Sequence, residues 1–455
     1  MCPIKYPGIA MSLHFHDKFQ RLSTTKLPIY KYLSSSFVLF YAPGILIKIH
    51  PDMIKEIEAG IILKKYNQLS DLLLKKAGEA SFSSRKMLKS SFVPTNITLY
   101  MNQKCNLDCQ YCFSVDGSIN SEELSIKSAL AGIEVVAKNC CNQNKPMTMV
   151  IHGGGEPLLS WQKIEQIMLG AISILKINGV NANKYIATNG VMSVEKARWL
   201  ATNFDRIGIS CDGPFNIQSV QRPAKNNLGT NQKIERTARI IREAGKKLDV
   251  RVTITPAVIE SQPLIARYIC ENLQANEIHV EPVYLGGKTK KEDCIDESQT
   301  DYFIQSFLEA QKIAEHFGSH WLISGTRLNE VHTSYCHIFQ QVLNLVPGEV
   351  ATACFKLVNS KQVEAEGMAL GYYCKETDQF KLDIPHFEAL LSQYALPSKC
   401  NDCFIEYQCS HGCPNNCLLM QESNDPSLCQ ILQGIAFAQI MQKAENMHYE
   451  EIYSF

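Results

Sequence analysis

The sequence predicts an α/β protein whose parallel sheet, an incomplete barrel or a doubly wound sheet, lies between a small N-terminal module and a cysteine-rich C-terminal region. In residues 95–290, six short apolar runs alternate with helical patterns, which is typical of parallel strands joined by right-handed crossovers. After residue 350 long apolar runs become rare, and eight of the 18 cysteines lie between residues 354 and 429. Such a region is typically held together by metal and not by a large core.

Composition narrows the class of protein. The chain has 455 residues, 45% of them hydrophobic and 20% charged, which is typical of globular and not of disordered proteins. Lys plus Arg equals Asp plus Glu at 45 each, so no global charge favours a nucleic acid or a membrane as partner. No secretory pattern occurs in residues 1–31, and 18 cysteines without an export signal favour a cytoplasmic protein that binds metal.

The first domain is predicted to span residues 1–94. The apolar run "FVLFYAPGILIKI" predicts a strand hairpin that turns at Pro43 and Gly44. Helical patterns follow from about Asp52 and over residues 69–76. A hairpin followed by helices fits a small winged-helix-like α+β module, and it fits a cap on the main domain equally well.

The second domain, 95–290, contains the six predicted strands: "NITLYM", "MTMVIH", "YIAT", "RIGIS", "VRVTITP" and "EIHVEP". The helical pattern "SEELSIKSALAGIEVVAK" between the first two is predicted to begin at an N-cap, Ser121. In either parallel architecture, the chemistry belongs at the carboxyl ends of the strands. Residues 291–350 are predicted to form a helical bridge to a last domain, 351–455.

Two motifs lie at the ends of the first two strands. Cys105, Cys109 and Cys112 follow "NITLYM", and three thiolates in one loop fit either a 4Fe-4S cluster with an open iron or a zinc site with a remote fourth ligand. "HGGGEPLL" follows the second strand, where bare glycine backbone can approach a ligand and Glu156 can receive a cationic group. An ordinary glycine turn is the alternative for this second motif.

Together these motifs resemble the radical S-adenosylmethionine (SAM) superfamily. The resemblance rests on Cys105-x3-Cys109-x2-Cys112, on the aromatic Tyr111 before the last cysteine, and on "GGGEP" at the second strand. The resemblance implies a partial (β/α)6 barrel and a 4Fe-4S cluster whose open iron binds S-adenosylmethionine. It also implies that Gly153, Gly154, Gly155 and Glu156 hold the methionine amino group. In that superfamily one electron from the cluster cleaves the cofactor to a 5'-deoxyadenosyl radical.

Further positions match the superfamily one at a time. "ATNG" resembles a strand end that would bring Thr188 and Asn189 near the cofactor. "ISCDGP" resembles the "SLDGP" stretch of a subfamily, which implies that Ser210 contacts the cofactor and that Arg222 binds its carboxylate. Relatives have a His-Asp pair shortly before that arginine, whereas this chain has Gln218 and Ser219.

The C-terminal cysteines resemble the SPASM auxiliary-cluster domain. The pattern is Cys400-x2-Cys403-x5-Cys409-x3-Cys413 followed by Cys429, with Cys354 and Cys374 upstream. The resemblance implies one complete 4Fe-4S cluster held by Cys400, Cys403, Cys409 and Cys429. It implies another held by Cys354, Cys374 and Cys413, whose fourth ligand would be Cys417, Cys336, substrate or solvent. Three 4Fe-4S clusters are therefore expected, with a structural double-zinc domain as the alternative.

SPASM proteins mostly modify peptides or proteins. Anaerobic sulfatase-maturing enzymes have an aspartate after the second auxiliary cysteine, where this chain has Lys375, so the resemblance favours a ribosomal-peptide maturase. Such an oxidoreductase would bind the leader of a precursor peptide through its N-terminal module and form a thioether or carbon-carbon cross-link. Its electron donor would be flavodoxin or ferredoxin, and Glu281 and Tyr284 are candidates for acid-base work.

Three other functions remain open from the sequence: a sulfatase-maturing enzyme, a peptide epimerase, and a non-enzymatic iron-sulfur or zinc protein that binds peptides. The intact first motif argues against the last of these. Neither a nucleic acid nor a membrane is expected as a partner.

Overall fold

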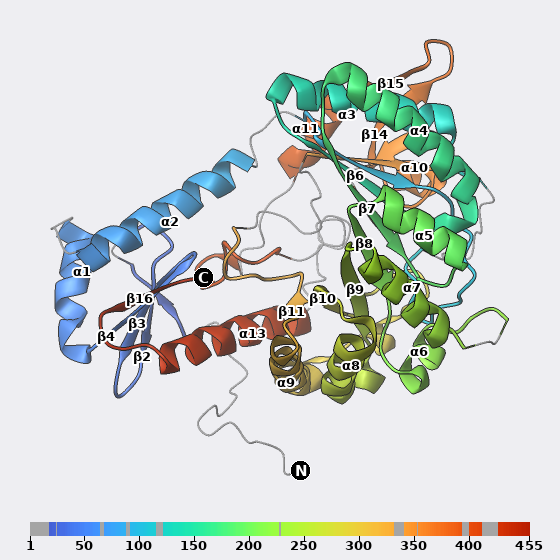
Figure 1. Ribbon diagram of the computed structural model, residues 1–455. Coiled ribbons are helices and arrows are strands. Elements are labelled where there is room, and N and C mark those ends of the chain that lie inside the picture. Colours follow the sequence, from blue (N-terminus) through green and yellow to red (C-terminus); the bar gives the residue numbers. More distant parts are fainter. Residues whose placement is uncertain are drawn as a thin grey trace.

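The computed structural model describes residues 18–23, 25–63, 68–87, 92–114, 122–226, 229–331, 341–352, 354–393, 400–411 and 426–455. Figure 1 shows a large curved sheet with helices on its outer side and a small separate sheet, with the C-terminal helix α13 (Pro426–Glu445) running between the two. None of the helices in the described ranges combines the length and the apolar composition that crossing a bilayer requires.

The central sheet is an incomplete barrel. Its six parallel strands lie side by side in chain order, which a doubly wound sheet would not show because its strand order reverses. They are β5 (Asn96–Tyr100), β6 (Met147–His152), β7 (Ala182–Thr188), β8 (Arg206–Ser210), β9 (Lys247–Ile254) and β10 (Glu277–Pro282). The predicted α/β fold and its partial barrel are therefore confirmed.

The same sheet continues at both ends. β11 (His320–Ile323) extends it in parallel beyond β10, after helix α9 (Thr300–His316). β12 (Val342–Val346) pairs in parallel with β5 and leads into the antiparallel strands β13 (Val350–Thr352), β14 (Ala369–Cys374) and β15 (Gln379–Leu382). The segment 291–350, expected as a helical bridge, thus contributes two strands to the barrel sheet.

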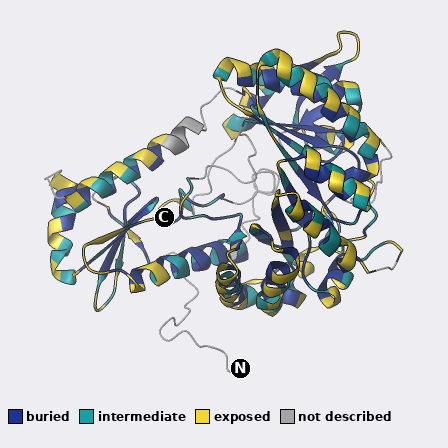
Figure 2. Ribbon diagram, viewed as in Figure 1, coloured by how far each residue is buried: buried dark blue, intermediate teal, exposed yellow. Residues whose placement is uncertain are grey.

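Burial alternates along β6 and β10, as expected for strands with helices on one face. In β6, Met147, Met149 and Ile151 are buried, whereas the residues between them are half-buried. Figure 2 shows the buried residues between the sheet and its helices. These helices are α3 (Ile126–Gln143), α4 (Trp161–Asn178), α5 (Val194–Asn203), α6 (Phe215–Gln221), α7 (Asn231–Glu243) and α8 (Gln262–Tyr268).

Helix α3 begins later than the sequence predicts. Its N-cap is Ser125, whose hydroxyl accepts a hydrogen bond from the Ser128 N–H. The predicted cap, Ser121, lies outside the described residues.

The N-terminal module is a five-stranded antiparallel sheet completed by the other end of the chain. It contains β1 (Gln20–Arg21), β2 (Tyr30–Leu33), β3 (Val38–Ala42) and β4 (Ile45–Ile49), followed by α1 (Ile54–Leu63) and α2 (Gln68–Met87). The predicted hairpin turn is present, with Gly44 at φ +82°. The C-terminal strand β16 (Glu451–Ser454) pairs with β4 and covers that edge.

The module packs on the last cysteine-rich loop. The Phe19 ring stacks on Phe404 at 5.1 Å, directly after Cys403 in the sequence. Lys48 in β4 donates to the carbonyls of Ala444 and Met447 at 2.8 Å each, which ties the module to the end of α13. The remaining helices are α10 (Ser360–Ala365) and α11 (Ile384–Gln393), beside β13 and β14.

Candidate functional site

The three-cysteine loop leaves β5 and crosses the mouth of the barrel. The Asp108 N–H donates to Pro223 O at 2.8 Å and the Gln110 N–H to Gln221 O at 3.0 Å, which anchors the loop on the far side. All three thiols are partly exposed, and burial raises the pKa of Cys109 to about 11. Thiolates at this loop therefore need a nearby positive charge, which bound iron would provide.

The glycine-rich segment after β6 interlocks with the cysteine loop. The Gly155 N–H donates to Asn102 O at 2.9 Å, and the Glu156 N–H donates to Lys104 O at 2.7 Å. A Cβ on Gly155 would lie 2.0 Å from the carbonyl oxygen of Lys104. One on Gly154 would lie 2.8 Å from the Val358 side chain, and one on Gly153 would lie 2.2 Å from the Gly155 carbonyl. Glycine is thus required for the two loops to meet.

The Glu156 carboxylate is 3% exposed and accepts three hydrogen bonds. Its Oε1 accepts from Leu158 N at 3.1 Å and from Thr188 Oγ1 at 2.8 Å, and its Oε2 accepts from Asn189 N at 2.8 Å. Burial raises the pKa of Glu156, and these donors partly offset that rise. The side chain therefore joins the ends of β6 and β7 and has little capacity left for a cationic ligand.

Asn189 contacts the cysteine loop, whereas the Thr188 hydroxyl donates to Glu156. That both lie near the cofactor, as "ATNG" predicts, stays a prediction. The Asn189 amide donates to Asn106 Oδ1 at 2.7 Å and lies 3.8 Å from Cys105 Sγ. The Leu107 N–H also donates to Cys105 Sγ, at 3.4 Å. N–H groups directed at a thiol sulfur stabilise its charged form.

Arg222 is 9% exposed and lies against Asp212, which the sequence analysis did not select. Its Nε lies 3.0 Å from Asp212 Oδ2, and its Cζ lies 5.2 Å from the centre of the Tyr111 ring. Although burial disfavours the charged guanidinium, Asp212 and Tyr111 hold the pKa of Arg222 well above its ordinary value. The guanidinium predicted to meet the cofactor is therefore held by an internal carboxylate.

Asp212 is fully buried and organises the end of β8. It accepts hydrogen bonds from the Tyr111 hydroxyl, from Gln221 Nε2 at 2.9 Å and from Thr253 N at 3.0 Å. Gln218, one of the two residues at which this chain departs from its relatives, accepts from the Asp212 N–H at 2.8 Å. The signal that could have found Asp212 is its place in "ISCDGP", directly after a barrel strand.

The barrel interior carries polar side chains on neighbouring strands. Ser210 pairs with Arg251, and Arg251 pairs with His279, so the three share the inner face. Glu281 lies one step nearer the mouth, where its Oε2 accepts from Tyr284 Oη at 2.7 Å and its Oε1 from Ser324 N at 3.1 Å. Burial raises the pKa of Glu281, whereas it lowers the pKa of His279 to about 4.

Four auxiliary cysteines come together beneath the N-terminal module: Cys400, Cys403, Cys409 and Cys429. Burial raises the pKa of Cys409, and the charges of the other three raise it further. Burial likewise raises the pKa of Cys403 to about 11. The Gln433 amide donates to Cys403 Sγ at 3.5 Å, and the His411 N–H donates to Cys409 Sγ at 3.3 Å. These soft donors fit an iron-sulfur cluster.

The predicted pairing of Cys354 with Cys374 in one cluster does not hold in this structure. β13 and β14 are antiparallel, with Thr352 opposite Ala369, so Cys354 lies at the start of β14 and Cys374 at its end. Five steps of strand separate these ends by about 17 Å. Cys374 Sγ instead contacts Glu376 Oε2 at 3.0 Å on an exposed turn. Cys413, Cys417 and Cys336 lie outside the described residues.

Cys354 itself lies near the barrel mouth. Its neighbour Phe355 accepts a hydrogen bond from Tyr100 Oη at 2.9 Å, and Val358 lies against Gly154. In the described part of the chain, no three His, Cys, Asp or Glu side chains converge tightly enough to hold a single metal ion. A four-iron cube needs no such convergence because it binds each thiolate at a separate corner, so the donors fit a cluster better than a zinc ion.

Residues 99–262 match the family model described as the Radical SAM superfamily. A cysteine-type anaerobic sulfatase-maturating enzyme of Clostridium perfringens (strain 13 / Type A) is 25% identical over 170 residues, which cover 37% of this chain and 46% of that enzyme. The chain thus spans about half the length of the curated relatives it matches.

Two solved structures share the fold. One is native anSMEcpe with bound AdoMet, at a TM-score of 0.60 and 18% identity over 78% of this chain and 100% of that one. The other is Streptococcus suis SuiB bound to the precursor peptide SuiA, at a TM-score of 0.53 and 16% identity over 87% of this chain and 98% of that one.

Proposed function

We propose that this chain, whose residues 99–262 form a radical SAM domain, is an enzyme that installs a thioether or carbon-carbon cross-link in a ribosomally synthesised peptide. The observation that carries the proposal is the interlocking of the cysteine loop with the glycine-rich segment at the barrel mouth. Cys105, Cys109 and Cys112 would hold a 4Fe-4S cluster there. S-adenosylmethionine bound to that cluster supplies a 5'-deoxyadenosyl radical.

The chain's own residues would hold the parts of the cofactor site in fixed positions relative to one another. Glu156 and Asn189 tie the glycine-rich segment to the cysteine loop, so the two halves of the cofactor site move together. The Asp212 and Arg222 pair fixes Tyr111, which precedes the last cysteine of the loop. Gly154, Gly155 and Ser210 are the positions at which the cofactor would approach the backbone and the inner face of the barrel.

A peptide substrate is supported by the N-terminal module. SuiB, similar over 87% of this chain, has been solved with its precursor peptide bound. A leader could add to the small sheet as a further strand, which is a general mode of peptide recognition. Because Phe404 packs under that sheet, the proposed cluster at Cys400, Cys403, Cys409 and Cys429 would lie beside the bound leader. It would accept the electron that the cross-linked radical loses as it becomes the product, while the proton goes to a base.

Glu281 is the proposed proton acceptor. It faces the barrel interior, and its raised pKa brings it toward the pH at which a general base works best. Lys375, the residue after Cys374, is 73% exposed and pairs with Glu349 at 3.3 Å. It takes no part in the proposed reaction.

Sulfatase maturation is the second candidate, because the curated relatives that match this chain are named for it. The two candidates separate by experiment. Anaerobically reconstituted protein with dithionite and S-adenosylmethionine should release 5'-deoxyadenosine, and C105A should release none. Incubation with a candidate precursor peptide, followed by mass analysis, should show loss of two hydrogens per event.

Other outcomes would redirect the proposal. Unchanged peptide mass with deuterium taken up from solvent would indicate epimerisation. Conversion of a cysteine in a sulfatase-derived peptide to formylglycine, without change in the precursor peptide, would favour sulfatase maturation. Release of no 5'-deoxyadenosine by wild-type protein with a full complement of iron would overturn the enzymatic proposal altogether.

A further inference from the structure

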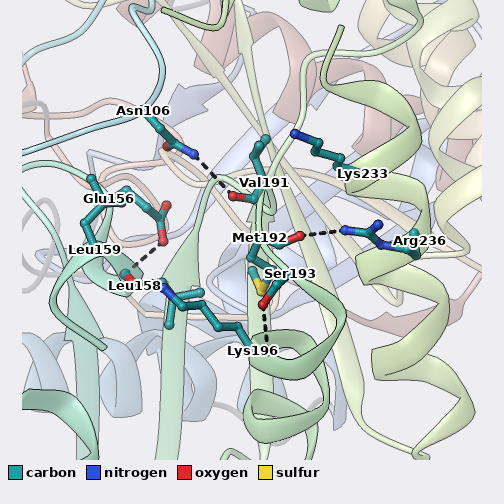
Figure 3. Close-up of a pocket in the computed structure, with 10 residues that line it drawn as sticks. All are labelled: Asn106, Glu156, Leu158, Leu159, Val191, Met192, Ser193, Lys196, Lys233 and Arg236. Atoms are coloured by element: carbon teal, nitrogen blue, oxygen red, sulfur yellow. Dashed lines mark hydrogen bonds between the residues drawn. The ribbon is translucent and has the colours of Figure 1, made fainter. Parts of the chain in front are cut away.

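A cavity of about 440 Å³ lies outside the barrel sheet, next to the cysteine loop. Its walls come from the loop residue Asn106, from the segment after β6, from the segment between β7 and α5, and from α7. Figure 3 shows Lys233 and Arg236 extending from α7 toward Val191 and Met192, with Lys196 of α5 on another side. The inner face of the barrel, where the substrate would react, is not part of it.

The cavity is lined by three cationic side chains and by a single acidic one, Glu156. That carboxylate is buried and already accepts three hydrogen bonds, so it is not available to neutralise the cations. Lys196 Nζ is held by Leu158 O at 2.8 Å, and Arg236 is held by Met192 O at 2.6 Å. The Lys233 ammonium has no ion-pair partner in the described part of the chain.

Only one pair of amides separates this cavity from a cluster ligand. Asn106 lines the cavity and donates to Val191 O at 3.2 Å. Its Oδ1 accepts from the Asn189 amide at 2.7 Å, and that amide lies 3.8 Å from Cys105 Sγ. A continuous series of contacts therefore runs from the cavity wall to the thiol.

We infer that this basic cavity is the docking site of an acidic one-electron carrier protein that reduces the cluster at Cys105, Cys109 and Cys112. The inference rests on the proposed function, which needs one electron for each cofactor cleaved. In the transfer the carrier loses one electron and the cluster gains it, and no atom moves between them. Carboxylates of the carrier would meet Lys196, Lys233 and Arg236, and the 46% exposed Leu159 would add apolar contact.

Charge complementarity selects this partner. Basic and acidic residues balance over the whole chain at 45 each, so a local group of three cations beside the cysteine loop is an exception to its composition. Such a group attracts an acidic protein and orients it with its redox centre toward the loop. A small anionic metabolite is the competing occupant, and it would not transfer an electron.

The test uses reconstituted holoenzyme and a bacterial flavodoxin as the probe. K233E reverses the charge of the cavity lysine that has no ion-pair partner among the described residues. As a control, K176E reverses the charge of an exposed lysine in the last turn of α4, away from the cavity. Calorimetric titration should show roughly tenfold weaker flavodoxin binding for K233E than for wild type, and unchanged binding for K176E. Binding by the wild type should also weaken as salt is raised.

A second measurement keeps docking separate from catalysis. Release of 5'-deoxyadenosine should be equal in all three proteins with dithionite, and it should fall about tenfold in K233E alone when reduced flavodoxin is the donor. Equal flavodoxin binding by K233E and K176E, or wild-type binding whose affinity does not change with salt, would overturn the proposed docking site. Wild-type protein that binds flavodoxin but releases nothing with dithionite would instead refute the proposed function.

Discussion

Replacing Asp212 by asparagine should destabilise the barrel more than any other isosteric change at the mouth. The carboxylate is fully buried and faces four donors, from Tyr111, Gln221, Arg222 and Thr253. An amide keeps one acceptor oxygen and turns an NH2 toward one of these donors. It also leaves the Arg222 guanidinium, 9% exposed, without a counter-charge. Removing one member of a buried pair costs about 3–5 kcal/mol.

For a domain the size of this barrel, that loss lowers Tm by roughly 10 °C. The assay is thermal unfolding of cluster-loaded protein under anaerobic conditions, with far-UV circular dichroism as the signal. Arg222→Gln provides the matched change, because the double variant D212N/R222Q no longer buries an unpaired charge. It should unfold above the temperature expected from adding the two single losses. Additive losses, or a shift under about 2 °C for D212N, would refute this role of the pair.

Four further outcomes follow from the site. Gly155→Ala should cut cluster loading severalfold, because its Cβ meets the Lys104 carbonyl at 2.0 Å, whereas Gly78→Ala, with nothing within 4 Å, should load normally. Glu281→Gln should lower cross-linking at least tenfold while 5'-deoxyadenosine release continues; an unchanged peptide product would exclude Glu281 as the base. Cys374→Ser should leave the iron content of reconstituted protein unchanged, and a loss of about four irons would mean that it is a ligand after all. Burial lowers the pKa of His152 to about 4, so the neutral, buried imidazole adds its full stabilisation above the unfolded pKa, and this stabilisation is lost as pH falls toward 4. His152→Gln should therefore flatten the fall of Tm with pH in that range.

The barrel strands were predictable because each combines β-branched residues with bounding turns, and all six occur where the sequence puts them. β11 and β12 were not, because they lie outside the alternating strand and helix pattern and their place depends on pairing with β10 and β5. The start of α3 was misplaced. The predicted cap was Ser121, whereas the N-cap of the helix is Ser125.

The site residues also differ in whether neighbouring residues in the sequence indicate their role. The cysteine loop and the glycine segment were predictable because their chemistry is encoded in neighbouring residues. The roles of Glu156 and Asp212 were not, since their partners come from other strands. Cys354 and Cys374 were assigned to one cluster by resemblance to the SPASM pattern, and the antiparallel register of β13 and β14 separates them.

The pairing of β16 with β4 has a consequence for how the chain is made. About 400 residues separate the two strands, so at about 5–20 residues per second the ribosome needs roughly 20 to 80 s after β4 emerges to deliver its partner. During that time the apolar edge of β4 is open to any other extended chain. The barrel, which lies between them in the sequence, can fold first, and the small sheet is completed last.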